Sequence, residues 1–385
     1  MDFSLSSEQS LLQDQVRKLA RSEFAPRAEA CDREKRFPAE NVARLSELGL
    51  MGLCLPEAFA GQGLSTFEFV LVLEQLARAC AATAGVYLIH AGVASRAIAA
   101  FGSDALKQKY LPALASGGKL AAFAMTEPEA GSAATDLSTR GALKGDHFLV
   151  NGTKRFISNG AEAEVFTTVV RLLDRPGAKG LGALVIDRGS PGFSVSKIED
   201  KMGLCGFSSA ELVFEDCRVP AENLLLPAGR FGQMMQAFNS ERCGNSAVCL
   251  GLAAAALDLA VDHSRVRRQF GRELAEFQGL QWMLAEMKIK VEAMRSLLYR
   301  AAASAEPFPE PILASITKAF CNETVNEVVS AALQIHGGYG YMKDYAVERL
   351  YRDARAWALA GGTTQIQKNT IASLLLDRKI SQRKP

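Results

Sequence analysis

The chain lacks the features that mark several large classes of protein. Its 385 residues carry a formal net charge of only +2, and no basic block exceeds a few residues, so the charge gives no case for a nucleic-acid partner. The amino-terminal sequence MDFSLSSEQS is acidic and polar, whereas a signal peptide needs a basic start and an apolar run. No apolar run comes near the ~20 residues of a membrane span. We therefore expect neither a signal peptide nor a membrane-spanning helix.

Metal ligands and disulfide patterns are also scarce. The four histidines are dispersed and the eight cysteines form no CxxC pair, so a metal cluster has nothing to build on. Reduced and mostly buried thiols are typical of a cytoplasmic protein, and we expect this compartment. The cysteines are Cys31, Cys54, Cys80, Cys205, Cys217, Cys243, Cys249 and Cys321.

The chain does have enough apolar residues for a large core. A composition of 48% hydrophobic and 22% charged residues is ordinary for a globular protein, and a chain of 385 residues has room for two or three lobes. Ser6 with Gln9, and Ser65 with Glu68, form capping boxes that each precede apolar residues at helical spacing. Residues 51–56 are apolar, and we expect them to be extended.

The pattern changes twice along the chain. We predict an N-terminal helical domain over residues 1–120, a β domain over residues 121–231 and a C-terminal helical bundle over residues 232–385. Short runs of β-branched and aromatic residues favour strands in the middle part, and Asn151 with Gly152 predicts a two-residue hairpin turn there. The helices expected in the bundle cover residues 234–264, 274–304, 312–336, 345–359 and 364–376. The predicted fold class is α+β, mostly α.

The segment over residues 334–367, QIHGGYGYMKDYAVERLYRDARAWALAGGTTQIQ, holds two glycine clusters. Glycine lets a main chain approach a ligand closely, and the N–H groups at the helix start expected near Thr363 can meet negative charge. GGYG follows a helix and lacks the spacing of a dinucleotide-binding fingerprint, so NAD is not expected. We interpret the segment as backbone that lies against a ligand.

The same segment resembles the C-terminal signature of the FAD-dependent acyl-CoA dehydrogenases. The residues that match by spacing are Gln334, Gly337, Gly338, Gly340, Tyr341, Asp344, Arg349 and Asp353. FAMTEPEAGS, residues 123–132, resembles the family's other signature, with Ala133 where aspartate is usual. The resemblance runs from about Phe3 to Leu376. It implies an N-terminal helical domain, a middle β-barrel or sandwich and a C-terminal four-helix bundle, with FAD at their junction.

Two sets of FAD contacts are implied by the resemblance. KRFISNG, residues 154–160, would place Phe156 beside the dimethylbenzene side of the flavin and Ser158 at the ring edge. The other contacts of this set are Phe123, Met125, Thr126, Ser132, Thr363 and Gln365. The second set would reach FAD in a neighbouring subunit and comprises Arg267, Gln269, Phe270, Gln278, Gln334, Gly337 and Gly338. Without the resemblance, a strand phenylalanine would be core and the RVRR segment a solvated helix face.

The family's usual catalytic base is missing. Many members carry a glutamate where this chain has Gly361, and dehydrogenation needs a carboxylate to take the α-proton while flavin N5 takes a hydride from the β-carbon. QAFNSERCG, residues 236–244, resembles the segment that carries the base in a branched- and long-chain minority, and the match assigns that role to Glu241. Gly361 keeps the backbone N–H that would polarise the thioester carbonyl.

Alone, Glu241 and Arg242 would be a surface ion pair worth under about 1 kcal/mol. The segment over residues 236–260 is otherwise poor in charge, however, which favours a functional role. A base buried against substrate and flavin would have its pKa raised towards the working pH. The implied acyl-CoA contacts are Ser132, Phe238, Asn239, Arg242 and Gly362.

Substrate and partners are less constrained. Ala360 and Gly361 stand where the family often has tyrosine and glutamate, so we expect a roomier pocket and a branched, cyclic or functionalised acyl group. The family implies a homotetramer, or at least a homodimer, and electron-transfer flavoprotein as the oxidant.

Two alternatives remain open. LAEFQGLQWM and AGGTTQIQ are similar to a desulfinase-like branch that cleaves the C–S bond of 3-sulfinopropionyl-CoA on the same fold. That branch lacks the base at both sites, whereas this chain has Glu241, and residues 81–85 contain no arginine suited to a sulfinate. A non-catalytic flavin-binding relative with a role in assembly is the other alternative.

Overall fold

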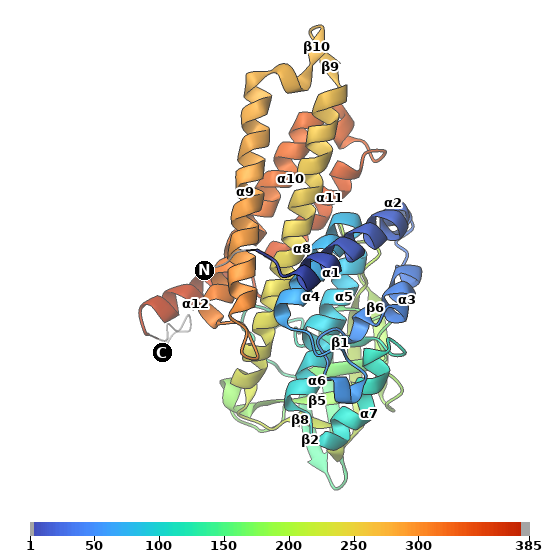
Figure 1. The fold of residues 1–385 in the computed structure, drawn as a ribbon. Coiled ribbons are helices and arrows are strands. Elements are labelled where there is room, and N and C mark those ends of the chain that lie inside the picture. Colours follow the sequence, from blue (N-terminus) through green and yellow to red (C-terminus); the bar gives the residue numbers. More distant parts are fainter. Residues whose placement is uncertain (1–3, 379–385) are drawn as a thin grey trace.

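A computed structural model describes residues 4–378 and shows a helical lobe, a β-sheet and a long helical bundle in chain order (Figure 1). Phe3, where the resemblance begins, lies outside the described residues. The helices of the first lobe are α1 (Ser7–Leu19), α2 (Ala25–Arg33), α3 (Ala39–Glu47), α4 (Thr66–Ala79), α5 (Ala81–Tyr87), α6 (Ser95–Phe101) and α7 (Asp104–Ala115). Both predicted capping boxes are present, at the starts of α1 and α4. The predicted fold class is confirmed.

The middle of the chain forms one eight-stranded sheet in the order β6-β7-β3-β2-β4-β5-β8, with β1 paired in parallel to β4. Its strands are β1 (Ala121–Ala124), β2 (Arg140–Lys144), β3 (His147–Ser158), β4 (Val165–Arg171), β5 (Leu181–Asp187), β6 (Phe193–Ile198), β7 (Ser209–Pro220) and β8 (Leu224–Leu226). The parallel register pairs Ala121 with Val165 and Ala124 with Thr168, so β1 ends inside the FAMTEP segment, whose first two residues belong to the strand.

Two local predictions were wrong. Asn151 and Gly152 do not form a turn, because β3 runs through them and the register shifts there against β7. The Asn151 side chain donates to the Asp216 carboxylate and accepts from the Asp216 N–H on the neighbouring strand β7. These two bonds stabilise a bulge in the sheet. Residues 51–56 are not extended. They begin inside a 3-10 turn, Leu50–Gly52, and continue as further turn. Met51, Leu53 and Leu55 are buried in the core, whereas Pro56 is exposed.

The bundle consists of α8 (Phe231–Val266), α9 (Gln278–Ala303), α10 (Pro311–His336), α11 (Ala346–Arg355) and α12 (Thr364–Leu375). A small hairpin of β9 (Arg268–Gln269) and β10 (Arg272–Glu273) joins α8 to α9 at the tip of the bundle (Figure 1). The long helix α8 runs through the core between α4 and α10 and is buried along most of its length. It therefore connects the β domain to the far tip.

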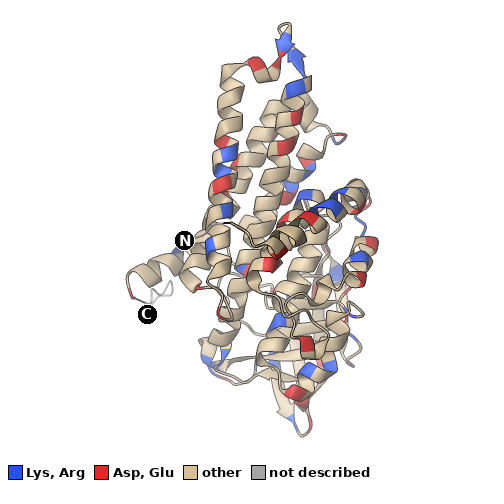
Figure 2. Cartoon of the chain, viewed as in Figure 1, with Lys and Arg blue, Asp and Glu red and all other residues tan. Residues whose placement is uncertain are grey.

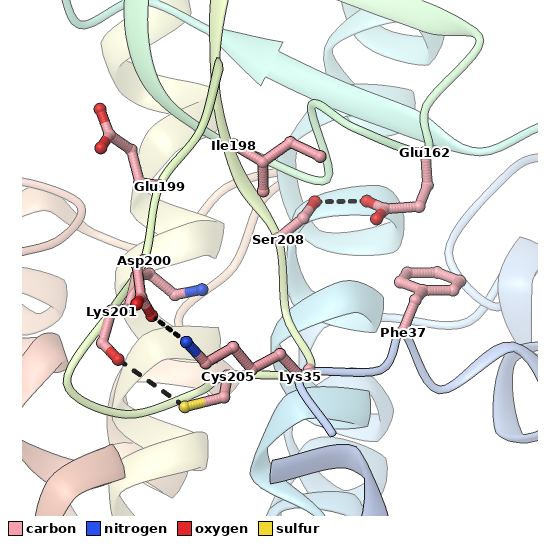
Figure 3. Close-up of a pocket in the computed structure, with 10 residues that line it drawn as sticks. Lys35, Phe37, Glu162, Ile198, Glu199, Asp200, Lys201, Cys205 and Ser208 are labelled. Carbon is pink, nitrogen blue, oxygen red and sulfur yellow. Dashed lines mark hydrogen bonds and ion pairs between the residues drawn. The ribbon is translucent and has the colours of Figure 1, made fainter. Parts of the chain in front are cut away.

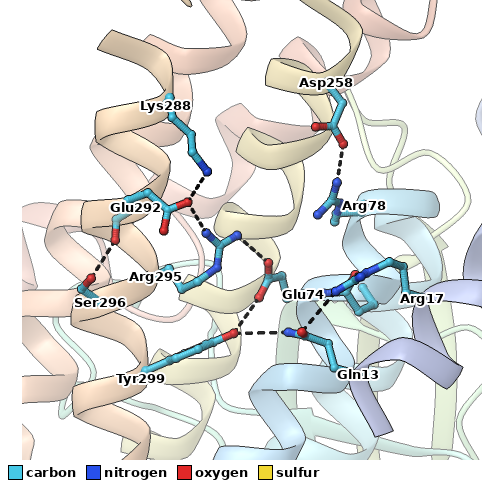
Figure 4. A network of polar contacts seen from close by, with 11 residues as sticks. Gln13, Arg17, Glu74, Arg78, Asp258, Lys288, Glu292, Arg295, Ser296 and Tyr299 are labelled. Carbon is cyan, nitrogen blue, oxygen red and sulfur yellow. Dashed lines mark hydrogen bonds and ion pairs between the residues drawn. The ribbon is translucent and has the colours of Figure 1, made fainter. Parts of the chain in front are cut away.

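The buried Glu74 carboxylate connects the first lobe to the bundle through hydrogen bonds. Glu74 on α4 is 1% exposed and accepts from Arg295 on α9 at 2.9 Å and from the Tyr299 hydroxyl at 3.3 Å (Figure 4). Burial with full pairing makes such a group sensitive to loss of either partner. The network fixes the position of α4 against the bundle, and α4 in turn packs on α8.

Within residues 4–378, two helical segments are long and apolar enough to cross a membrane, although we expected none. They are Ala81–Phe101 and Phe231–Val266, and 78% of the most apolar window of each is buried inside the protein. The core helices of a folded domain meet the same length and hydropathy criterion, and burial accounts for the apolar character of both segments.

Candidate active site

Glu241 and Gly361 meet within the bundle, where α8 lies against the turn between α11 and α12. Glu241 lies on α8 and is 3% exposed, so it is not part of an ordinary surface ion pair. Gly361 lies in the turn between α11 and α12 with a φ of 64°. A Cβ atom placed on Gly361 would lie 2.5 Å from Glu241 Oε1. The carboxyl group therefore occupies space that any side chain at position 361 would need.

The surroundings of Glu241 suit proton transfer. Burial raises the pKa of its carboxyl group above the ordinary glutamate value, while the positive charges of Lys318 and Arg242 and the nearby Asn245 side chain oppose the rise. Within residues 4–378, Oε2 of Glu241 is buried and has no hydrogen-bond partner. A buried carboxyl group with a raised pKa and an unpaired oxygen can take up a proton from a ligand beside it.

Lys318 is a residue of this site that sequence reasoning missed. It projects from α10, is completely buried, and donates to Ala360 O at 2.7 Å and to Gly362 O at 2.9 Å. Burial lowers its pKa to about 8, and the Glu241 charge opposes that change. A signal existed in the sequence, because Lys318 lies at helical spacing among apolar residues such as Ala314.

Arg242 and its neighbours extend the site along α8. The Arg242 side chain is buried and donates from Nη1 to Asn239 Oδ1 at 2.7 Å, and its Nε has no partner within the described residues. Phe238 packs against Phe123 of β1, with ring centroids 5.3 Å apart. The predicted contacts on α8 and on β1 are thus brought together.

The turn after β1 is clamped to β3 by a buried ion pair. Lys154 Nζ donates to Glu127 Oε1 at 2.7 Å and to Met125 O at 3.0 Å. Burial alone would raise the pKa of Glu127, but the Lys154 ammonium and hydrogen bonds outweigh burial and bring the pKa to about 2. The backbone N–H of Arg155 donates to Thr126 O at 2.8 Å. The predicted contacts Met125 and Thr126 therefore lie in a fixed turn.

Phe156 stands out within β3. It is 57% exposed and has a φ of 58°, in the left-handed region that a bulky residue seldom adopts. The register with β7 shifts between Lys154 and Ile157, so the strand bulges at this residue and turns its ring outward. Strained backbone of this kind clusters where a ligand is held. The half-buried Ser158 ends the same strand.

The second predicted set of contacts lies elsewhere. Arg267, at the end of α8, is 26 residues from Glu241, which corresponds to roughly 40 Å along a helix. Its guanidinium lies 5.0 Å from the Tyr339 ring, next to the exposed Gly337 and Gly338. The structure groups Gln269, Phe270, Gln278 and Gln334 with these residues at the bundle tip. Within one chain the two predicted sets are not brought together.

The remaining predicted residues lie at the edge of the site. Thr363 caps α12, where its hydroxyl accepts from the Ile366 N–H at 3.3 Å. Ser132, Gly362 and Gln365 are exposed. Exposure leaves Ser132 and Gln365 free to meet a ligand, whereas the Gly362 carbonyl already accepts from Lys318 Nζ and from Gln367 Nε2.

A surface pocket of the described chain is separate from these residues. It has a volume of about 260 Å³ and lies between the first lobe and the β6–β7 connection (Figure 3). Lys35 and Asp200 pair across it at 2.7 Å, and Ser208 donates to Glu162. Within the described chain no predicted site residue lines this pocket. Of its other charged groups, Glu199 pairs with Arg155 and Lys197, and Lys201 donates to Phe207 O.

Comparisons with known proteins agree with the resemblance. The family models match as acyl-CoA dehydrogenase N-terminal domain over residues 6–118, middle domain over residues 122–217 and C-terminal domain over residues 231–376. The acryloyl-CoA reductase (NADH) of Anaerotignum propionicum is 42% identical over 384 residues, which cover 98% of this chain and 97% of that protein. The 3-sulfinopropanoyl-CoA desulfinase of Paraburkholderia xenovorans is 40% identical, with 99% of each chain covered.

A solved structure matches equally well. Butyryl-CoA dehydrogenase from Megasphaera elsdenii superposes with a TM-score of 0.95 at 34% identity, and the match covers 98% of this chain and all (100%) of that one. The chain therefore belongs to the acyl-CoA dehydrogenase family, a family of FAD-dependent oxidoreductases.

Proposed function

We propose that this chain binds FAD and removes the α- and β-hydrogens of an acyl-CoA thioester to give the 2-enoyl-CoA. The residues present fit the cofactor: a strained and exposed aromatic at Phe156 stands beside the turn of Met125 and Thr126, which the buried Lys154 pair fixes. When bound there, FAD supplies the acceptor for the hydride that leaves the β-carbon.

The contact of Glu241 with Gly361 is the observation that carries the proposal. The Glu241 carboxylate takes the α-proton of the thioester, and its buried position keeps water from competing for that role. The Gly361 N–H donates to no acceptor within the described residues, so it can donate to the thioester carbonyl oxygen, where negative charge develops. In this arrangement the Glu241 carboxylate and the Gly361 N–H lie next to each other, so both can act on the same thioester group.

The remaining contacts hold the thioester. Arg242, with its unpaired Nε, provides a cation for the CoA part of the thioester. Phe238 and Asn239 lie beside it on α8. Glu241 fills the space beside Gly361, so the extra room that we infer for a branched, cyclic or functionalised acyl group is at Ala360. Ser132 and Gly362 complete the contact set at the edge.

We also propose an oligomer. The bundle-tip set around Arg267 can serve a flavin only in another subunit, so a homodimer at least is required, and the family arrangement is a homotetramer. Electron-transfer flavoprotein is the proposed oxidant, by analogy with the family. The cytoplasm is the proposed compartment, because free and mostly buried thiols are typical of it.

A desulfinase activity is the second candidate, because a relative 40% identical to this chain carries that name. The buried base at Glu241 favours proton abstraction over C–S cleavage. The reaction of the acryloyl-CoA reductase relative is the reverse of dehydrogenation, in which Glu241 would return the proton to the α-carbon.

Anaerobic titration of the purified yellow holoenzyme tests these candidates together. We expect butyryl-, isobutyryl- or glutaryl-CoA to bleach the flavin and yield the enoyl-CoA. Release of sulfite from 3-sulfinopropionyl-CoA with no bleaching by the other thioesters would replace the proposal with desulfination. A yellow protein that no thioester bleaches would favour the non-catalytic assembly relative.

A further inference from the structure

Lys318 bridges the turn that carries Gly361. Its ammonium donates to Ala360 O at 2.7 Å and to Gly362 O at 2.9 Å, so the two accepting carbonyls flank the glycine. Both glycines of the turn have positive φ, 64° at Gly361 and 85° at Gly362, a backbone conformation that side-chain-bearing residues rarely adopt. The turn is held in this conformation from α10.

Because the peptide group is planar, the hydrogen bond from Lys318 to the Ala360 carbonyl also determines the direction of the Gly361 N–H. In a trans peptide the C=O of Ala360 and the N–H of Gly361 share one plane and point in opposite directions. Because Lys318 holds the Ala360 carbonyl on its own side, the Gly361 N–H must point away from Lys318. One side chain on α10 thus determines where the candidate oxyanion donor is aimed.

The same ammonium acts on Glu241. The charged or titratable groups that face Glu241 from the packed elements are Lys318 on α10 and, on α8, Arg242, Cys243 and Cys249. Burial raises the pKa of Cys243 to about 12 and that of Cys249 further, so both thiols stay neutral. Lys318 is therefore one of two cations that favour the ionised form of the base.

We propose that Lys318 is a positioning residue of the active site, which aims the Gly361 N–H at the thioester carbonyl and keeps Glu241 ionised. The inference rests on the proposed function, because both groups act in proton abstraction. A purely structural lysine that only ties α10 to the turn is the competing explanation. It would affect stability but leave the pH at which the base ionises unchanged.

Proton abstraction can be measured apart from flavin reduction. In D2O, Glu241 exchanges the α-protons of butyryl-CoA for deuterons, and the exchange is followed by NMR under anaerobic conditions with the holoenzyme. The variants are Lys318→Met, which removes the charge and the donors, and Lys318→Arg, which keeps the charge. Lys368→Met is the matched control, because Lys368 joins α12 to Glu323 of α10 at the surface.

We expect Lys318→Met to slow α-proton exchange at least about tenfold and to move the acidic limb of its pH profile upward by about one unit or more. Lys318→Arg should exchange α-protons more slowly than the wild type, but the acidic limb of its pH profile should not move. Lys368→Met should match the wild type in both rate and pH profile. The limb moves upward because a carboxyl group without its cation stays protonated to higher pH.

Two results overturn the inference. One is an Lys318→Met profile that coincides with the wild type in rate and limb. The other is an equal loss of rate in both Lys318 variants with no movement of the limb, which indicates a structural lysine. If Lys318→Met does not fold, Lys318→Arg alone decides. An acidic limb that moves to higher pH in this variant, which keeps the charge, contradicts the inference. Wild-type enzyme that exchanges no α-proton would instead remove the proposed function, and the inference with it.

Discussion

At the scale of single residues, the site depends on a side chain that is absent. Gly361 has no Cβ atom, and the carboxyl group of Glu241 on α8 occupies the space that a Cβ would need. A Cβ built on Gly361 would lie 2.5 Å from Glu241 Oε1. The glycine is also required by the backbone, since its φ of 64° lies in the left-handed region. The two residues can be understood only as a pair.

Replacing the glycine should therefore damage both stability and chemistry. In Gly361→Ala, left-handed strain and the contact with Glu241 should cost about 1–3 kcal/mol and displace the carboxyl group. We expect a lower unfolding temperature and slower flavin reduction. Gly279→Ala is the control, because Gly279 is exposed near the start of α9 with no atom near its added Cβ. Equal behaviour of the two variants would contradict the packing described here.

The buried charge of Glu241 should be visible in stability. Burial raises its pKa, so the folded protein binds more protons than the unfolded chain between the two pKa values, and stability falls as the pH rises through that interval. Glu241→Gln carries no such cost. Thermal unfolding of the holoenzyme should give a higher midpoint for Glu241→Gln near neutral pH. The gap should close once the pH is below the ordinary glutamate value, and a gap that widens on acidification would contradict the assignment.

At the scale of elements, the turn after β1 is the part that positions the predicted flavin contacts. Lys154 and Glu127 are both buried and paired, and the lysine also holds the Met125 carbonyl. Breaking a buried pair from one side leaves an uncompensated charge, which costs more than the pair itself contributes.

We therefore expect Lys154→Met to be strongly destabilised, by about 3–5 kcal/mol, and to retain FAD poorly. Lys197→Met serves for comparison, because Lys197 on β6 pairs with Glu199 at the surface. Thermal unfolding and the flavin-to-protein absorbance ratio measure both effects. The account of the clamp fails if Lys154→Met keeps the stability and flavin content of Lys197→Met.

Local signals predicted elements where the interaction itself is local. The capping boxes at Ser6 and Ser65 lie within three residues, so sequence alone identified both helix starts. Asn151 with Gly152 was misassigned because its partner, Asp216, is 65 residues away on β7, and a local turn pattern does not contain that pairing. Lys318 was missed for a similar reason, since its role depends on a turn 42 residues further along.

At the scale of the whole molecule, periodicity and composition predicted the order helical, β, helical, and the resemblance supplied the fold. Neither could show that Glu241 and Gly361 meet, because α8 and the α11–α12 turn come together only in the folded bundle. The predicted contacts also separate into two distant sets, and the bundle tip is mainly basic (Figure 2). Phe270 at this tip is 94% exposed and has a φ of 52°.

This separation predicts that flavin retention depends on assembly. Arg267→Met should release FAD at protein concentrations where the wild type still holds it, because a phosphate-binding cation from the neighbouring subunit is lost. Arg265→Met is the control, since Arg265 is exposed and pairs with Asp262 on the same helix. Flavin fluorescence on dilution, alongside sedimentation velocity, measures release and assembly together. An FAD affinity that is independent of both Arg267 and dilution would contradict the shared site.

The most direct test of the central claim concerns Glu241 as the base. Wild type and Glu241→Gln, each loaded with FAD, are mixed anaerobically with the thioester that bleaches the wild type fastest, and flavin absorbance is followed. We predict that Glu241→Gln binds FAD and thioester as the wild type does but reduces the flavin at least about 10²-fold more slowly. Reduction at the wild-type rate would show that another group removes the α-proton and would end the assignment.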